Sequence, residues 1–166
     1  MRESRLKEFK HYGAHYPKEV LENMPDPQAE ETFTSAKLNR NECFRPRHES
    51  VLNLYRECLQ LRARAHIFQN PSRDLWSVQP VTDQVLALRW RDPDGDWLLL
   101  IGVTPGEQSI PLEEPFIRSK PGRRWNLQIA SNDPCFGNCP SQTFWSEDTH
   151  AFHLSLPGAV LLREAS

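Results

Sequence analysis

Clustered carboxylates are the residues of this chain that come nearest to a catalytic pattern, because two of them can serve as general acid and nucleophile. The acidic clusters are Glu30-Glu31, Asp92-Pro-Asp-Gly-Asp96, Glu113-Glu114 and Glu147-Asp148. A catalytic pair needs its two groups on opposite sides of the bond that breaks, and one group needs a raised pKa. Nothing around these clusters would raise a carboxyl pKa, and adjacent acidic residues on polar segments are typical of a solvated surface. We therefore predict that the chain carries no catalytic residue.

Metal ligation is the second chemistry to consider. The alternating acids of 92–96 are similar in type to those of a calcium loop, but the segment is too short and lacks the closing Glu, so it predicts a hairpin turn. Cys135 and Cys139 lie in a Pro/Gly/Asn loop, and their spacing is compatible with a local disulfide or with half of a zinc site. Zinc would require two further ligands, and His150 and His153 on one strand would point to opposite faces. We predict reduced thiols, no metal site and no cofactor.

Tryptophan rings offer a third chemistry, since flat aromatic rings stack on the faces of sugars. Trp90 and Trp97 flank one hairpin closely enough to form such a platform, and Trp145 lies beside a polar segment. Strand alternation places Trp90 and Trp97 on apolar faces, which favours packing in a core or between domains. All three are carbohydrate-binding candidates, and we expect Trp145 to be the most exposed of them.

A helix over 48–65 is the strongest element that the sequence predicts, because apolar residues recur at helical spacing with polar residues between them. The apolar residues are Val51, Leu54, Tyr55, Cys58, Leu59, Leu61 and Ala65. This long amphipathic helix must pack its stripe against the rest of the chain or another chain, since an exposed apolar patch favours association. A homodimer through 48–65 is therefore one expected assembly.

From residue 75 onward the hydrophobic period changes to that of strands. The segment 84–91 alternates and 97–103 is almost wholly apolar, which predicts a hairpin with a buried second strand. Further strands are expected at 75–81, 108–112, 124–130, 143–145, 151–156 and 159–163. Short strands with frequent turns indicate an antiparallel β-sandwich. We predict a mainly β fold with N-terminal helices, divided into a helical segment at 1–70 and an antiparallel β-sandwich at 71–166.

Composition excludes several partners. A net charge of −2 and a pI near 6.3 give no electrostatic reason to bind nucleic acid or acidic lipid. No apolar run approaches the roughly 20 residues that a membrane helix needs, and the polar opening 1–5 lacks the apolar centre of a signal peptide. We expect a cytoplasmic protein with neither nucleic acid nor membrane as a partner.

The most distinctive segment is Met24-Pro25-Asp26-Pro27-Gln28, in which two prolines stiffen a connection between helices. Thr32-Phe33 and Ala36-Lys37-Leu38-Asn39 follow it. The pattern resembles the motif PDPQ…TF…SKLDW near the C-terminal end of maltooligosyltrehalose trehalohydrolases, enzymes of the α-amylase superfamily (glycoside hydrolase family 13). Later segments follow the strand order of that family's C-terminal domain: 85–89, 98–103, 125–129 and 156–162.

The resemblance implies an amylase-type C-terminal β-domain preceded by the last helix of a catalytic (β/α)8 barrel. It makes Asp26 and Gln28 candidates for carbohydrate contact, although turn hydrogen bonds in a stiff connection are a sufficient structural role. Ala36, Asn39 and Arg40 depart from the Ser, Asp and Trp of the motif. A (β/α)8 barrel typically needs about 250 residues, so we expect no barrel in a chain of 166 residues that opens just before the motif.

The expected function is that of a non-catalytic C-terminal part of a trehalohydrolase-like glycoside hydrolase, with a structural role or an interaction with α-glucan or a partner protein. Three alternatives stay open. The chain could be a fragment of an active trehalohydrolase that releases trehalose from maltooligosyltrehalose. It could instead be a stand-alone carbohydrate-binding module, or a regulatory subunit that completes a truncated barrel on another polypeptide.

Overall fold

The computed structural model describes residues 4, 7, 8, 11, 23, 25–70, 72–136 and 150–165, with only the backbone of Leu156. The chain divides into two compact units, Met1–Glu42 and Cys43–Ser166, and each is described by itself. The predicted division at residue 70 follows the change from helix to strand and stays a prediction. In the described part of the chain, no helix has both the length and the apolar character to cross a membrane.

The first unit contains the short helix α3 (Glu30–Ser35), which follows the two prolines of the distinctive segment. Its N-cap, Ala29, makes no side-chain capping bond. Thr32 Oγ1 instead reaches back and donates a hydrogen bond of 2.6 Å to the carbonyl oxygen of Asp26. The stiff connection is thereby tied to the first turn of the helix. A 3-10 turn, Arg40–Phe44, runs from this unit into the second.

Helix α4 (Pro46–Arg64) confirms the helix predicted over 48–65. Pro46 suits the first helical position because that residue needs no amide donor. With 19 residues the helix is about 28 Å in length, so it is short rather than long. None of its residues is buried, and Val51, Tyr55 and Leu59 of the expected stripe are all exposed. Two 3-10 turns, η2 (His66–Gln69) and η3 (Arg73–Leu75), lead from α4 to the sheet.

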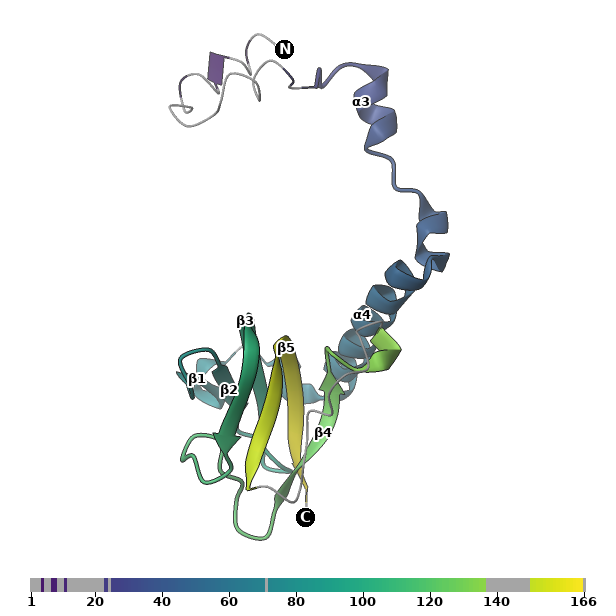
Figure 1. Ribbon diagram of the computed structural model, residues 1–166. Coiled ribbons are helices and arrows are strands. Elements are labelled where there is room, and N and C mark those ends of the chain that lie inside the picture. Colours follow the sequence, from purple (N-terminus) through teal and green to yellow (C-terminus); the bar gives the residue numbers. More distant parts are fainter. Residues whose placement is uncertain are drawn as a thin grey trace. The chain divides into compact units, whose positions relative to one another are not determined.

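The described strands form one antiparallel five-stranded sheet in the order β1-β2-β3-β5-β4 (Figure 1). They are β1 (Trp76–Pro80), β2 (Leu86–Trp90), β3 (Trp97–Pro111), β4 (Arg124–Ala130) and β5 (Ala151–Ala165). A mainly antiparallel β fold behind N-terminal helices is confirmed. The strand expected at 143–145 lies outside the described residues.

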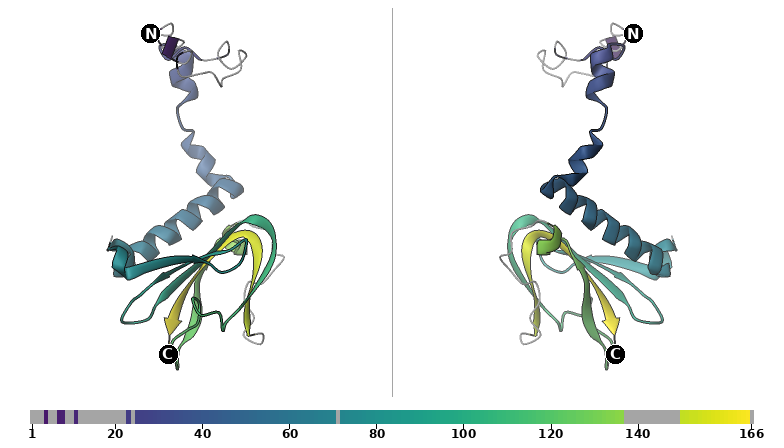
Figure 2. Two further views of the ribbon diagram at one scale, coloured as in Figure 1. Left: turned by 90° about the vertical axis from the view of Figure 1, so that its left-hand side faces the viewer. Right: turned by 90° about the vertical axis from the view of Figure 1, so that its right-hand side faces the viewer.

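Four of the predicted short strands join in pairs to form two continuous strands, so the expectation of many short strands was wrong in this respect. The segments 97–103 and 108–112 both belong to β3, and 151–156 and 159–163 both belong to β5. A Pro-Gly pair lies between the two predicted segments of each strand, at 105–106 and at 157–158. These pairs accompany a register shift between Gly102 and Gly106, a bulge that bends the paired strands without breaking the sheet. Figure 2 shows β3 and β5 arching together at this bend.

The bend gives the sheet a core without a second sheet among the described strands. Strand β2 and the halves of β3 and β5 that lie beside it contribute Ala87, Leu98, Leu100, Val160 and Leu162 from one face. The far halves of β3 and β5 contribute Ile110, Phe152 and Leu154 to the same cluster. The packing of a sandwich therefore arises from one sheet that folds over onto itself.

Candidate functional site

The sheet has a second apolar face, opposite to the core, which we call the aromatic face. The strand register places these residues on it: Trp76, Val78, Leu86, Leu88, Trp90, Trp97, Leu99, Ile101 and Leu161. Trp76, Trp90 and Trp97 form one row across three strands because they pair directly. A row of large aromatic side chains is typical of surfaces that bury area against a partner.

Phe68 of η2 covers one end of the aromatic face. Its ring centroid lies 5.1 Å from that of Trp90 and 5.0 Å from that of Trp97, both in edge-on geometry. Trp97 is only 4% exposed, and its indole Nε1 donates a hydrogen bond of 3.3 Å to Asp92 Oδ2. The two candidate tryptophans are thus brought together, but Phe68 packs against both rings.

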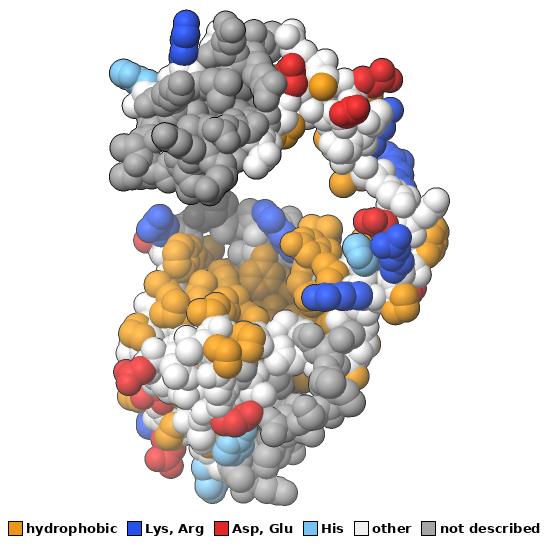
Figure 3. All heavy atoms as spheres, turned by 45° about the horizontal axis from the view of Figure 1, so that its top comes forward, with side chains coloured by type: hydrophobic (Ala, Val, Ile, Leu, Met, Phe, Trp, Pro, Cys, Tyr) orange, Lys and Arg blue, Asp and Glu red, His pale blue; other side chains and the backbone are white. Residues whose placement is uncertain are grey.

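Val78 and Leu86 are the exposed residues of the aromatic face, whereas Leu161 is only 8% exposed. Val78 is 52% exposed and Leu86 is 48% exposed. Ala87, the next residue of β2, points to the core side and is fully buried. Hydrophobic side chains gather into a broad area on the part of the molecule that carries the sheet (Figure 3). Extended exposed apolar area on a folded domain marks an interaction site.

A cleft of about 1100 Å³ lies next to this face, between α4 and β4. We call it the α4–β4 cleft. Helix α4 runs beside the 3-10 turn η4 (Pro134–Phe136), which follows β4 in sequence (Figure 1). Trp97 and Arg163 lie at the sheet side of the cleft, where the Arg163 guanidinium sits 5.1 Å from the centre of the Trp97 ring.

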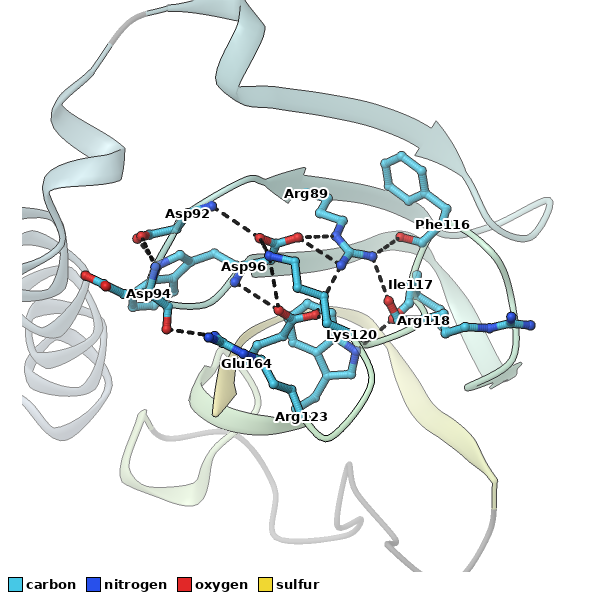
Figure 4. A network of polar contacts seen from close by, with 12 residues as sticks. Arg89, Asp92, Asp94, Asp96, Phe116, Ile117, Arg118, Lys120, Arg123 and Glu164 are labelled. Atoms are coloured by element: carbon cyan, nitrogen blue, oxygen red, sulfur yellow. Dashed lines mark hydrogen bonds and ion pairs between the residues drawn. The ribbon is translucent and has the colours of Figure 1, made fainter. Parts of the chain in front are cut away.

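A charge network of Arg89, Asp96, Lys120 and Glu164 joins β2, the turn before β3, β5 and the loop before β4 (Figure 4). Arg89 Nε donates to Asp96 Oδ2 at 2.9 Å, and Arg89 Nη2 donates to Glu164 Oε1 at 3.1 Å. Lys120 Nζ lies 2.5 Å from Asp96 Oδ1 and 3.7 Å from Glu164 Oε2. Two buried carboxylates therefore face two cations, so the formal charges balance.

Backbone groups complete the network. Arg89 Nη1 donates to the carbonyl oxygens of Phe116 and Arg118, and the amides of Lys120 and Asp96 donate to the Glu164 carboxylate. Burial would raise the pKa of Asp96, but the hydrogen bonds from Lys120 and Arg89 outweigh it and hold that pKa below its ordinary value. A carboxylate that is held in this way, as Asp96 is, fastens strands together and is poorly suited to proton transfer.

Asp92-Pro-Asp-Gly-Asp96 is the hairpin turn between β2 and β3. Asp92 Oδ1 accepts a hydrogen bond from the amide of Asp94, and Gly95 adopts a φ of 143°, which favours glycine. Among the described residues, no group of three or more His, Cys, Asp and Glu side chains is placed to hold a metal ion. Cys135 is a free cysteine, and Cys139 lies outside the described residues.

The remaining candidates are Asp26, Gln28 and Trp145. Asp26 Oδ1 accepts a hydrogen bond of 3.0 Å from the amide of Gln28, a local turn within the first unit. Gln28 is exposed and Asp26 is partly buried. Trp145 lies outside the described residues, so the structure does not place it. A carbohydrate-binding role for Asp26, Gln28, Trp90, Trp97 or Trp145 stays a prediction.

Sequence reasoning missed both Phe68 and the charge network. Phe68 lies in a 3-10 turn with no periodic signal. Arg89 and Glu164 are 75 residues apart, so no local spacing connects them. The one available signal was Arg89 itself, since strand alternation places it with Ala87 on the core side, where a cation requires a partner.

No protein-family model matches the chain. Over 53 residues the chain is 43% identical to malto-oligosyltrehalose trehalohydrolase from Deinococcus radiodurans, a match that covers 32% of this chain and 9% of that protein. Among solved structures, a putative α-amylase from Salmonella typhimurium is similar over 99% of this chain and 23% of its own, with a TM-score of 0.62 and 24% identity. Trehalose-6-phosphate hydrolase from Bacillus licheniformis is similar over 68% of this chain and 18% of its own, with a TM-score of 0.50 and 13% identity.

These findings confirm the resemblance to the C-terminal region of maltooligosyltrehalose trehalohydrolases and to the α-amylase family of glycoside hydrolases. The structural likeness concerns the fold, because its sequence identities are low. The chain spans less than a quarter of the length of each of these relatives.

Proposed function

We propose that the chain acts as the non-catalytic C-terminal part of a trehalohydrolase-like glycoside hydrolase, and that it docks on the catalytic barrel through the aromatic face. The observation that carries the proposal is the difference between the two faces of the sheet. One face is closed by the bend of β3 and β5, while the other leaves Val78 and Leu86 about half exposed. A sheet that is apolar on both faces requires a covering layer on each.

The state of the described carboxylates supports a non-catalytic role. Among the described residues, Asp96 and Glu164 are the buried acidic ones, and both form ion pairs with Arg89 and Lys120. A retaining glycosidase instead holds two carboxyl groups on either side of a sugar, one of them protonated at neutral pH. The network faces the core side of the sheet and is saturated with its own hydrogen bonds. A cytoplasmic location is part of the same proposal.

Two measurements test the proposal. The purified chain, incubated with maltooligosyltrehalose, is expected to release no trehalose. The chain is also expected to bind the separately produced catalytic barrel of a maltooligosyltrehalose trehalohydrolase. Leu86→Asp, in the open part of the aromatic face, should abolish that binding, because it places a charge in an apolar interface. Gln79→Asp is the matched control, since Gln79 is exposed on the opposite side of the same strand pair.

Trehalose release by the chain alone would contradict the non-catalytic role and favour the alternative of an active fragment. Equal binding of the barrel by Leu86→Asp and Gln79→Asp would contradict docking through the aromatic face. Affinity electrophoresis of the chain in soluble starch or glycogen tests the alternative of a stand-alone carbohydrate-binding module. The mobility of such a module would fall in the presence of the glucan.

A homodimer through α4 is a second candidate assembly. Val51, Tyr55 and Leu59 follow one another at spacings of four residues, so they lie along one side of the helix, and each is at least half exposed. Such a stripe on a helix without a buried residue can pair with its copy in a second chain. This assembly and docking on a barrel differ in stoichiometry, which light scattering measures directly.

A further inference from the structure

Helix α4 exposes an apolar stripe that has an arginine at each end. Val51, Tyr55 and Leu59 follow one another at spacings of four residues and are between 50% and 65% exposed. Arg47 precedes Val51 by four residues, and Arg62 follows Leu59 by three. Both arginines are exposed, and neither forms an ion pair in the described part of the chain. We call these five residues the basic stripe.

The acidic residues of α4 lie on other sides of the helix. They are Glu49 and Glu57. At about 100° per residue, Glu49 lies about 120° and Glu57 about 160° around the helix from Tyr55. Glu57 lines the α4–β4 cleft, on the side of the helix that faces the sheet. The helix therefore provides no carboxylate that could neutralise the basic stripe.

These charges argue against a second copy of the chain as the partner of the basic stripe. In antiparallel pairing centred on Tyr55, Arg47 of one helix would lie beside Arg62 of the other, and in parallel pairing each arginine would face its own copy. Like charges placed together in an interface oppose association. A partner with an apolar strip and a carboxylate at each end would pair with both arginines instead. Because the arginines are 15 residues apart, these carboxylates would be separated by about 22 Å.

We propose that the basic stripe of α4 contacts an acidic strip on the catalytic barrel, with Tyr55 as the apolar anchor and Arg47 and Arg62 paired with carboxylates of the barrel. This inference rests on the proposed function and names the chemistry of the surface that covers α4. Tyrosine and arginine are the residue types that contribute most at protein interfaces. An acidic lipid surface fits less well, because the stripe has only three apolar residues and neither Trp nor Phe among them.

The test measures binding of the full chain to the separately produced catalytic barrel of a maltooligosyltrehalose trehalohydrolase by calorimetry. The double variant Arg47→Glu/Arg62→Glu should raise the dissociation constant about 10-fold or more, because two attractive pairs become repulsive. Arg91→Glu/Arg118→Glu is the matched control, since both arginines are exposed and lie near Arg89, away from α4. It makes the same change in net charge and should bind as the parent does.

The salt dependence of the parent is a second measurement that needs no variant. Raising the salt concentration from about 0.05 M to about 0.5 M should weaken binding of the parent about 5-fold, because salt screens ion pairs at an interface rim. The same change should not weaken binding of Arg47→Glu/Arg62→Glu. Circular dichroism of that variant checks that the helix is retained.

Equal binding by the parent and Arg47→Glu/Arg62→Glu, with Leu86→Asp still abolishing it, would overturn this inference and leave the proposed function intact. A parent chain that does not bind the barrel would overturn both. Binding of phosphatidylserine vesicles that Arg47→Glu/Arg62→Glu abolishes would assign the basic stripe to a membrane surface and overturn the inference. A parent dimer that Tyr55→Ser converts to a monomer would overturn it as well, because a second copy would then cover the stripe.

Discussion

Replacement of Arg89 by methionine is expected to remove most of the stability of the second unit. The substitution retains an unbranched apolar stem and deletes the guanidinium. The Asp96 and Glu164 side chains, which are 3% and 0% exposed, then share the single cation of Lys120. The carbonyl oxygens of Phe116 and Arg118 lose the same donor.

The magnitude follows from burial. Removing one partner of a buried pair costs about 3–5 kcal/mol, because a charge stays in the interior without compensation. Lys120→Met deletes the same formal charge, but the Lys120 side chain is 47% exposed against 15% for Arg89. Solvent screens that charge, and we expect a loss of about 1 kcal/mol. The two variants should therefore differ by about 3 kcal/mol although their net charges are identical.

Urea unfolding at neutral pH, followed by tryptophan fluorescence, measures the difference. All five tryptophans lie in the second unit, so the signal reports on the sheet. With a slope of about 2 kcal/mol per M, Arg89→Met should lower the midpoint by about 2 M and Lys120→Met by about 0.5 M. Arg91→Met, at an exposed position, is the matched control and should change stability by less than about 0.5 kcal/mol. Equal losses for Arg89→Met and Lys120→Met would refute the reasoning, since charge count and not burial would then decide stability.

Three further predictions concern the turn, the pH dependence and the helix. Gly95→Ala should destabilise the unit by more than about 1 kcal/mol in the same urea assay, because its φ is positive and the added methyl group would collide with a backbone carbonyl of β5. The ion pairs of Asp96 should stabilise the fold fully at pH values above its ordinary pKa of 3.8, and this stabilisation should be lost as the pH falls through the lowered pKa of the folded state. The difference in unfolding free energy between the parent and Asp96→Asn should therefore become smaller below pH 3.8. A difference that does not change with pH would contradict this. If α4 forms a homodimer, replacing Val51, Tyr55 and Leu59 together by serine should give a monomer in light scattering, whereas a parent chain that is already monomeric would exclude that assembly.

Local patterns predicted α4 and the β2–β3 hairpin because each depends on neighbouring residues. The helix needs only a 3.6-residue period, and the hairpin needs an alternating strand, a turn and an apolar strand. The continuity of β3 across its bend, and that of β5, could not be predicted in this way. A Pro-Gly pair reads as a strand end along the chain, but pairing with the adjacent strand carries the sheet through the bend.

The sequence predicted which residue types belong to the candidate site, but it did not predict which other residues they contact. Trp90 and Trp97 were identified and assigned to apolar faces by alternation, and the strand register shows that they share one face. The packing of Phe68 and of Arg163 against Trp97 depends on contacts between segments that are distant in sequence. Such contacts leave no periodic trace, so the cleft and the charge network became visible only once the chain was folded.

Helix α4 and the aromatic face both leave apolar side chains exposed to solvent. An isolated helix is only marginally stable in water, and α4 buries none of its residues. The sheet likewise leaves Val78 and Leu86 open to solvent. Both surfaces belong to the same compact unit. A partner that covers only the helix, such as a second copy paired along α4, would leave the sheet face exposed. A partner that reaches both would stabilise each of them, which is why we favour docking on a catalytic barrel over a homodimer.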